Sequence, residues 1–132
     1  MASKKLKILF IQPNSGPLLF IGGPLGRMLE IRYDVDTINM GCAHSSLGEQ
    51  VVQQMIEYIS ARDRAEYDLV IAPSGTQLID SIRAQHLGPI AGYAVHRSFD
   101  SGQYEHNLFM NQYVQSRGKL YADIEMIVNE RA

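Results

Sequence analysis

The sequence predicts an α/β fold, a three-layer sandwich with helices on both faces of a mostly parallel four-stranded sheet. Short apolar runs alternate with segments in which apolar residues recur at helical spacing, the pattern of repeated strand–helix–strand units. The most apolar runs, residues 6–11 and 69–72, are continuous, as in strands that are buried on both faces of a parallel sheet. The chain has 132 residues, the length of a single domain spanning residues 1–132.

Four segments are predicted as strands: residues 6–11, 33–40, 69–72 and 89–95. Pro13 and Pro73 follow the first and third of them closely and end those runs. The second alternates apolar and polar residues, which is typical of a less buried strand near an edge. We therefore expect strands one and three at the centre, in the flavodoxin-like order 2-1-3-4.

Helices are predicted between the strands and after them, at residues 25–32, 46–59 and 74–86 and from Tyr104 almost to the C-terminus. Ser46 with Glu49, and Ser74 with Gln77, have the spacing of capping boxes, in which each side chain satisfies the other residue's free backbone N–H. The last segment keeps helical period through to Val128, with Gly118 interrupting or bending it. No fifth strand is predicted after Val95.

The apolar segment at residues 17–26 has two interpretations. Flanking glycines would suit a mobile lid, whereas its four consecutive apolar side chains, residues 18–21, would be costly to leave exposed. The second consideration favours the packed start of a helix.

Composition excludes several classes of protein. Twelve basic against fourteen acidic residues give a net charge of −2, which argues against nucleic acid as a partner. One cysteine, Cys42, cannot form an intramolecular disulfide or a multi-cysteine zinc site. No run has the length and flanks of a signal peptide or a spanning helix, so we expect a cytoplasmic protein with no membrane partner.

Polar residues follow the predicted strands one, three and four. In open α/β sheets, ligands bind beyond the carboxyl ends of the strands where the strand order reverses, here between strands one and three. This placement gathers eight candidate substrate-binding and catalytic residues: Asn14, Ser15, Ser74, Gly75, Thr76, His96, Arg97 and Ser98. His96 is the catalytic candidate, since imidazole exchanges protons near neutral pH, and the others would bind an anionic or carbonyl-containing metabolite.

Structural roles remain open for the same residues. Ser74 and Thr76 suit a helix N-cap, Asn14 suits a turn, and His96 could be a hydrogen-bonded histidine with no catalytic task. We expect no cofactor and no metal. The glycines at 22–26 lack dinucleotide-binding spacing, and Cys42 and His44 form only a lone C-x-H pair.

Residues 67–92 (YDLVIAPSGTQLIDSIRAQHLGPIAG) resemble a strand–helix–strand unit of aspartate/glutamate and hydantoin racemases, and residues 8–16 (ILFIQPNSG) resemble the first strand and turn of that family. The resemblance implies a small-molecule site at these turns. The nucleophilic cysteine of the family would fall at Pro73, so racemisation by a cysteine pair is not implied.

Two other resemblances lead to different functions. Pro13-Asn14 and residues 95–98 (VHRS) are similar to motifs of type II dehydroquinate dehydratases, which implies active-site roles for Asn14 and His96. Residues 25–41 resemble the first helix and second strand of response-regulator receivers. Gln12 and Pro13 stand where a receiver has its acidic pair, so this resemblance implies a receiver in shape only, without phosphorylation.

The sequence thus leads to two hypotheses. The first is a small-molecule-binding protein, an enzyme if His96 performs isomerase- or lyase-type proton transfer on an anionic metabolite. The alternative is a non-phosphorylatable, receiver-like module for interaction or assembly. In either case the C-terminal segment, residues 104–132, is the candidate surface for a homo-oligomer.

Overall fold

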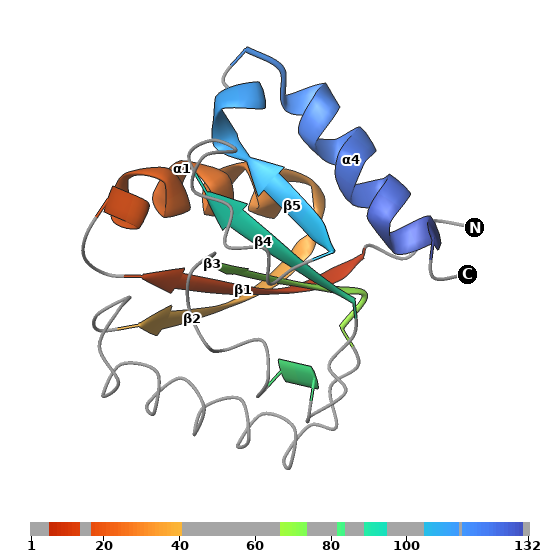
Figure 1. Ribbon diagram of the computed structural model, residues 1–132, viewed down its shortest axis with the longest axis horizontal. Helices are drawn as coiled ribbons and strands as arrows, with labels where there is room; N and C mark the ends of the chain where they lie inside the picture. Colours follow the sequence, from red (N-terminus) through yellow and green to blue (C-terminus); the bar gives the residue numbers. More distant parts are fainter. Residues whose placement is uncertain are drawn as a thin grey trace.

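The computed structural model describes residues 6–13, 17–40, 67–73, 82–83, 89–94, 105–113 and 115–130, which form an α/β fold around a five-stranded parallel sheet (Figure 1). The strands are β1 (Lys7–Pro13), β2 (Asp34–Met40), β3 (Leu69–Pro73), β4 (Ile90–Ala94) and β5 (His106–Phe109). Their order is β2-β1-β3-β4-β5. The predicted order of the first four strands is confirmed, and each lies within a few residues of its predicted position.

The sequence prediction missed β5. Residues from Tyr104 onward were expected to be helical, yet His106–Phe109 pairs in parallel with β4. The 3-10 helix η2 (Met110–Gln112) follows, and then α4 (Arg117–Glu130). Four residues are too few for apolar spacing to separate a strand from a helix, and Leu108 and Phe109 are both buried.

The C-terminal helix is shorter than predicted and starts later. Gly118 lies in the first turn of α4, so it neither interrupts nor bends the helix in its middle. The backbone N–H of Lys119 donates to the Ser116 hydroxyl at 3.3 Å, an N-cap bond that fixes the start of α4 just before Arg117.

The first helix, α1 (Pro17–Arg32), begins eight residues earlier than the predicted 25–32. Its first residue is a proline, which is favoured at that position because the N–H it lacks would have no partner within the helix. The segment at 17–26 is thus helical backbone. The side chains of residues 17–22 lie outside the described part of the structure.

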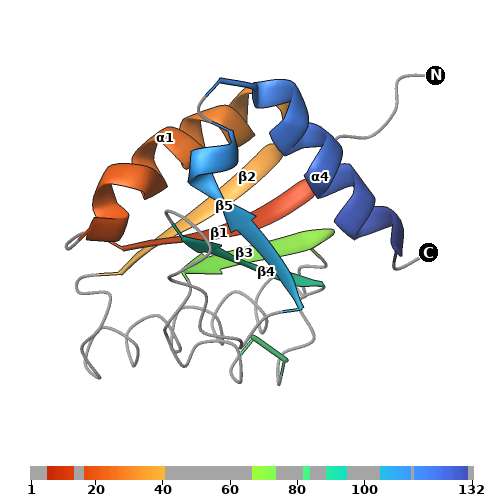
Figure 2. The same cartoon turned by 45° about the horizontal axis from the view of Figure 1, so that its top comes forward.

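Both described helices lie on one face of the sheet (Figure 2). The core on that face joins Ile8 and Phe10 of β1 to Leu29 of α1 and to Leu120 and Ile124 of α4, all fully buried.

On the opposite face, Leu9, Ile11, Val70 and Ala72 have no exposed surface either. The central strands are therefore buried on both faces, as their continuous apolar runs predicted. The helix expected at 46–59, and that at 74–86 apart from the helical Ile82 and Arg83, lie outside the described residues.

Polar and aromatic contacts join α1 to α4. The Tyr121 hydroxyl donates to the Met28 carbonyl at 2.7 Å, and Arg32 forms a 2.8 Å ion pair with Glu125. Tyr33 packs edge-on against Tyr121, with ring centroids 5.7 Å apart. Burial raises the pKa of Tyr33 to about 12, because it penalises the charged phenolate, and the nearby Glu125 carboxylate adds to this effect.

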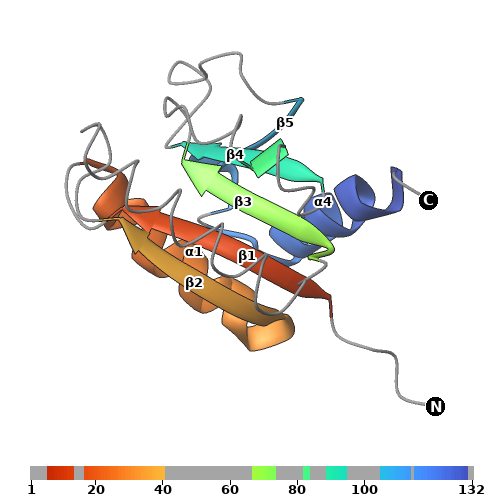
Figure 3. The same ribbon diagram turned by 90° about the horizontal axis from the view of Figure 1, so that it is seen from below.

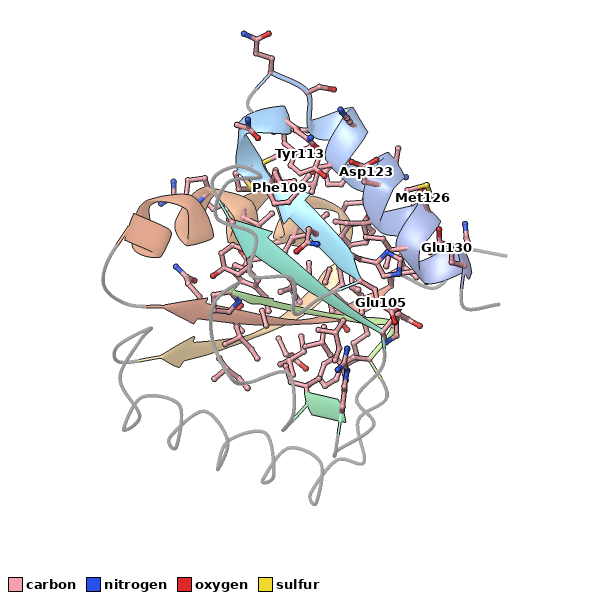
Figure 4. The ribbon with its side chains drawn as sticks, viewed as in Figure 1. Glu105, Phe109, Tyr113, Asp123, Met126 and Glu130 are labelled. Carbon is pink, nitrogen blue, oxygen red and sulfur yellow. The ribbon has the colours of Figure 1, made fainter. Side chains whose placement is uncertain are left out.

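Two further contacts join α4 to the segment before it. The Tyr113 hydroxyl donates to Asp123 at 2.7 Å, and Figure 4 shows these two side chains together. Burial raises the pKa of Tyr113, and the hydrogen bond to Asp123 raises it further. His106, at the start of β5, lies 3.4 Å from the Glu130 carboxylate at the end of α4. The last helix is thus tied to β5 at its C-terminal end and to the turn after β5 at its middle.

Candidate functional site: the carboxyl ends of β1 and β3

The strand order reverses between β1 and β3. The chain proceeds from β1 outward to β2, and then returns to β3 on the other side of β1 before continuing to β4 and β5. The strands are parallel, so their carboxyl ends lie at one edge of the sheet (Figure 3). This is the position at which open α/β sheets bind ligands.

Pairing between the two central strands stops before either strand ends. The β1–β3 ladder runs only to Phe10 opposite Ile71. By contrast, β1 stays paired with β2 as far as Pro13, and β3 stays paired with β4 as far as Pro73. The last residues of β1 and β3 therefore keep their ladder pairing with the outer neighbours β2 and β4.

Successive backbone carbonyls of β1 point in turn toward β2 and toward β3. The Leu6 carbonyl accepts from Asp34 at the start of β2, whereas the Lys7 carbonyl accepts from Asp68 just before β3. Because backbone groups alternate along a strand, the carbonyls of Leu9 and Ile11 also point toward β3.

Proline explains why the ladder ends. The Val70 N–H donates to Pro89 on the β4 side, so the backbone groups of the alternate residues 69, 71 and 73 face β1. If the register continued, Gln12 of β1 would lie opposite Pro73 of β3. The backbone N–H of residue 73 would then be the donor to the Ile11 carbonyl. Proline has no N–H, and Pro13, which would next donate toward β3, has none either. Two prolines, one register position apart, thus stand at the point where the order reverses.

A tyrosine supplies the missing hydrogen bond. The Tyr93 hydroxyl donates to the Ile11 carbonyl at 3.1 Å, from a side chain with no exposed surface. Its ring packs against Phe10 at a centroid distance of 5.4 Å. Tyr93 therefore spans from β4 to β1 beneath the end of the central ladder, and sequence reasoning did not single it out. The only available signal was an aromatic residue beside Gly92 in an otherwise small apolar strand.

Gln12 is a second residue that the sequence reasoning missed. It lies next to the end of β1 on the α1 side, with its amide nitrogen 4.0 Å from the position that a Cβ on Gly23 would take. Its side chain is partly exposed. Alternate residues of a strand point to the same face, so Gln12 lies on the face of Ile8 and Phe10, which is covered by α1. This alternation is the sequence signal that could have placed Gln12 beside α1.

The described residues at these strand ends are uncharged. The last two residues are Gln12 and Pro13 in β1, Ala72 and Pro73 in β3, and Tyr93 and Ala94 in β4. No carboxylate of the strand ends themselves would therefore repel an anion here. Charge complementary to an anion would have to come from the loops.

The residues predicted from sequence to form the site all lie outside the described part of the structure: Asn14, Ser15, Ser74, Gly75, Thr76, His96, Arg97 and Ser98. Cys42 and His44 lie outside it too. What the structure does give is the position of the strands that carry these segments: Pro13 precedes Asn14, and Pro73 precedes Ser74. The roles of the eight residues therefore remain predictions.

Among the residues that the structure describes, no helix has both the length and the apolar character needed to cross a membrane. Neither models of protein families nor curated proteins give a match to the sequence.

Proposed function

We propose that the protein binds a small anionic or carbonyl-containing metabolite at the carboxyl ends of β1 and β3 and catalyses acid–base chemistry on it. The observation that carries this proposal is the end of the β1–β3 ladder at the point where the strand order reverses. Open α/β sheets bind their ligands at such a reversal, beyond the carboxyl ends of the strands. The described strand ends carry no carboxylate that would repel an anionic ligand.

The residues of the adjoining loops would supply the chemistry. In this proposal His96 removes a proton from the carbon next to a carbonyl or carboxylate, and returns it in an isomerisation or delivers it to a departing hydroxide in a dehydration. Arg97 pairs with the negative charge of the substrate. The remaining loop residues orient the substrate through hydroxyl, amide and backbone groups: Asn14, Ser15, Ser74, Gly75, Thr76 and Ser98. The single cysteine supports the cytoplasm as the compartment.

A thermal-shift screen tests this proposal. Small 2-hydroxy, 2-keto and amino acids, with lactate, pyruvate and aspartate as the first of each class, are added to the intact protein. We expect at least one to raise the melting temperature, and we expect His96→Ala and Asn14→Ala to abolish the shift. His106→Ala is the matched control, because His106 begins β5 at the opposite end of the sheet. A shift that His106→Ala removes and His96→Ala preserves would contradict the proposed site.

The alternative function, a receiver-like assembly module acting through residues 104–132, has less support. Leu120, Ile124 and Ile127 are the buried residues of α4 and pack into the core of their own chain. Met126, 56% exposed, is the large hydrophobic residue that the described part of α4 leaves open to solvent. One exposed methionine is far less than the apolar core of a stable interface. No hit in the screen, together with a discrete homo-oligomer in light scattering, would favour this alternative.

A further inference from the structure

Gln12 lies at the carboxyl end of β1, where the order of the strands reverses, and it is partly exposed. The preceding residues on the same face of the strand, Ile8 and Phe10, have no exposed surface. Along this face, Gln12 is therefore the described residue at which β1 passes from the buried core to solvent.

The other described residues at the ends of β1, β3 and β4 have no side chain that could form a hydrogen bond with a ligand. The prolines and alanines at these ends have no polar side-chain atom. The Tyr93 hydroxyl already donates to the Ile11 carbonyl, and Tyr93 has no exposed surface. In the described part of these three strand ends, Gln12 is thus the residue that combines a polar side chain with access to solvent.

The contact between α1 and β1 is less tight at Gln12 than one turn further along the helix. A Cβ on Gly26 would lie 3.2 Å from Cε2 of Phe10, closer than such contacts normally are. A Cβ on Gly23 would lie 4.0 Å from the amide nitrogen of Gln12, which is an ordinary contact distance. The Gln12 amide therefore lies in the looser part of this contact.

A primary amide has the chemistry to hold a carboxylate. Its –NH₂ group has two donors and carries no charge, and a hydrogen bond to an ionised acceptor is stronger than one to a neutral acceptor. The described ends of β1, β3 and β4 contain no carboxylate that would compete for these donors.

From this position we propose that the Gln12 side-chain amide binds the carboxylate of the ligand, with its N–H donating to a carboxylate oxygen. The ligand is then a small carboxylic acid, such as a 2-hydroxy or 2-keto acid, and not a neutral carbonyl compound. This inference rests on the proposed function, since it names a binding residue and a class of ligand for the same site.

A reversal of ligand preference tests the contact. Isothermal titration calorimetry gives the dissociation constants of lactate and pyruvate, and of their neutral amides lactamide and pyruvamide. We expect the wild type to bind the carboxylates at least about tenfold more tightly than the amides. Gln12→Glu keeps the size of the side chain but replaces its donors by a negative charge. This variant should reject the carboxylates and prefer the amides, whose –NH₂ groups can donate to the new carboxylate.

Two further variants complete the test. Gln12→Ala should weaken lactate or pyruvate binding about tenfold, the loss of one hydrogen bond to a charged group. The matched control is Gln112→Glu, which makes the same change at an exposed glutamine that follows the edge strand β5. We expect this control to keep the preference for carboxylates. If Gln12→Glu and Gln112→Glu give the same preference, the Gln12 amide does not contact the carboxylate.

The contact and the binding function fail in different ways. If Gln12→Ala binds lactate or pyruvate as tightly as the wild type does, while His96→Ala abolishes binding, the contact is overturned and the proposed function stands. Equal weakening of carboxylates and amides by Gln12→Glu also overturns the contact, because the loss would not depend on the charge of the ligand. If the wild type binds none of the compounds, the proposed function fails, and the contact fails with it.

Discussion

The two ends of the sheet are constructed in opposite ways. At the amino end, the Lys7 N–H donates to the Asp68 carboxylate at 2.8 Å, and the Asp68 N–H donates back to the Lys7 carbonyl at 2.8 Å. The Tyr67 hydroxyl donates to Asp36 at 2.9 Å, and the Lys7 ammonium lies over the Tyr67 ring at 5.4 Å. These contacts join β1, β2 and the entry to β3.

At the carboxyl end, the ladder between the same central pair of strands stops at Phe10 and Ile71. Pro13 and Pro73 end the β1–β3 ladder, and the Tyr93 hydroxyl caps the Ile11 carbonyl. The difference indicates a division of tasks. Charged and aromatic contacts at one end hold the strands in register, and the other end carries the loops in which we propose the binding site.

The largest expected effect is at the amino end. Asp68→Ala removes the carboxylate that accepts from the Lys7 backbone, and a charge-assisted bond of this kind stabilises the fold by about 2 kcal/mol. Urea denaturation of the variant should show that loss as a lower midpoint with an unchanged slope. Ligand binding at the opposite end should keep its affinity.

Asp34→Ala is the matched control for Asp68→Ala, because Asp34 is an exposed carboxylate at the same end of the sheet. We expect its midpoint to stay near that of the wild type. If both variants lose the same stability, the Asp68 bond does not distinguish the amino end.

The next effect is at the carboxyl end. Tyr93→Phe leaves the buried Ile11 carbonyl without this donor, which should cost about 1.5 kcal/mol in the free energy of unfolding. Tyr33→Phe is the comparison, since the Tyr33 hydroxyl is also buried but has no hydrogen-bond partner among the described residues. Removing that hydroxyl should be neutral or stabilising in the same denaturation experiment. Equal losses from both would refute the capping role of Tyr93.

The smallest effect concerns the proline itself. Pro73→Ala restores an N–H facing β1, so the Ile11 carbonyl gains a second donor and depends less on Tyr93. A double-mutant cycle should show that Tyr93→Phe costs about 1 kcal/mol less in the Pro73→Ala background. An additive cycle would mean that Pro73 does not cause the ladder to end.

The structure agrees with the sequence where a continuous apolar run predicts a buried strand. Residues 6–11 and 69–72 could be placed at the centre because strands buried on both faces have no polar side. β5 could not be predicted, because its four residues form a strand only through pairing with β4 and packing against α4, and both are contacts with other parts of the chain. For the candidate site, the sequence predicts a sheet edge and three loops, and the loop residues lie outside the described part of the structure, so their roles stay predictions. The sequence did not predict Gln12 or Tyr93.

The sequence by itself determined the α/β class, the order of the first four strands and the prolines that follow strands one and three. These follow from local patterns of burial and backbone chemistry. Only the tertiary structure decided that the end of β1 lies beside Pro73, and that a tyrosine 82 residues from Ile11 caps its carbonyl. The register between distant strands depends on how their side chains pack together, and no local stretch of sequence carries that information.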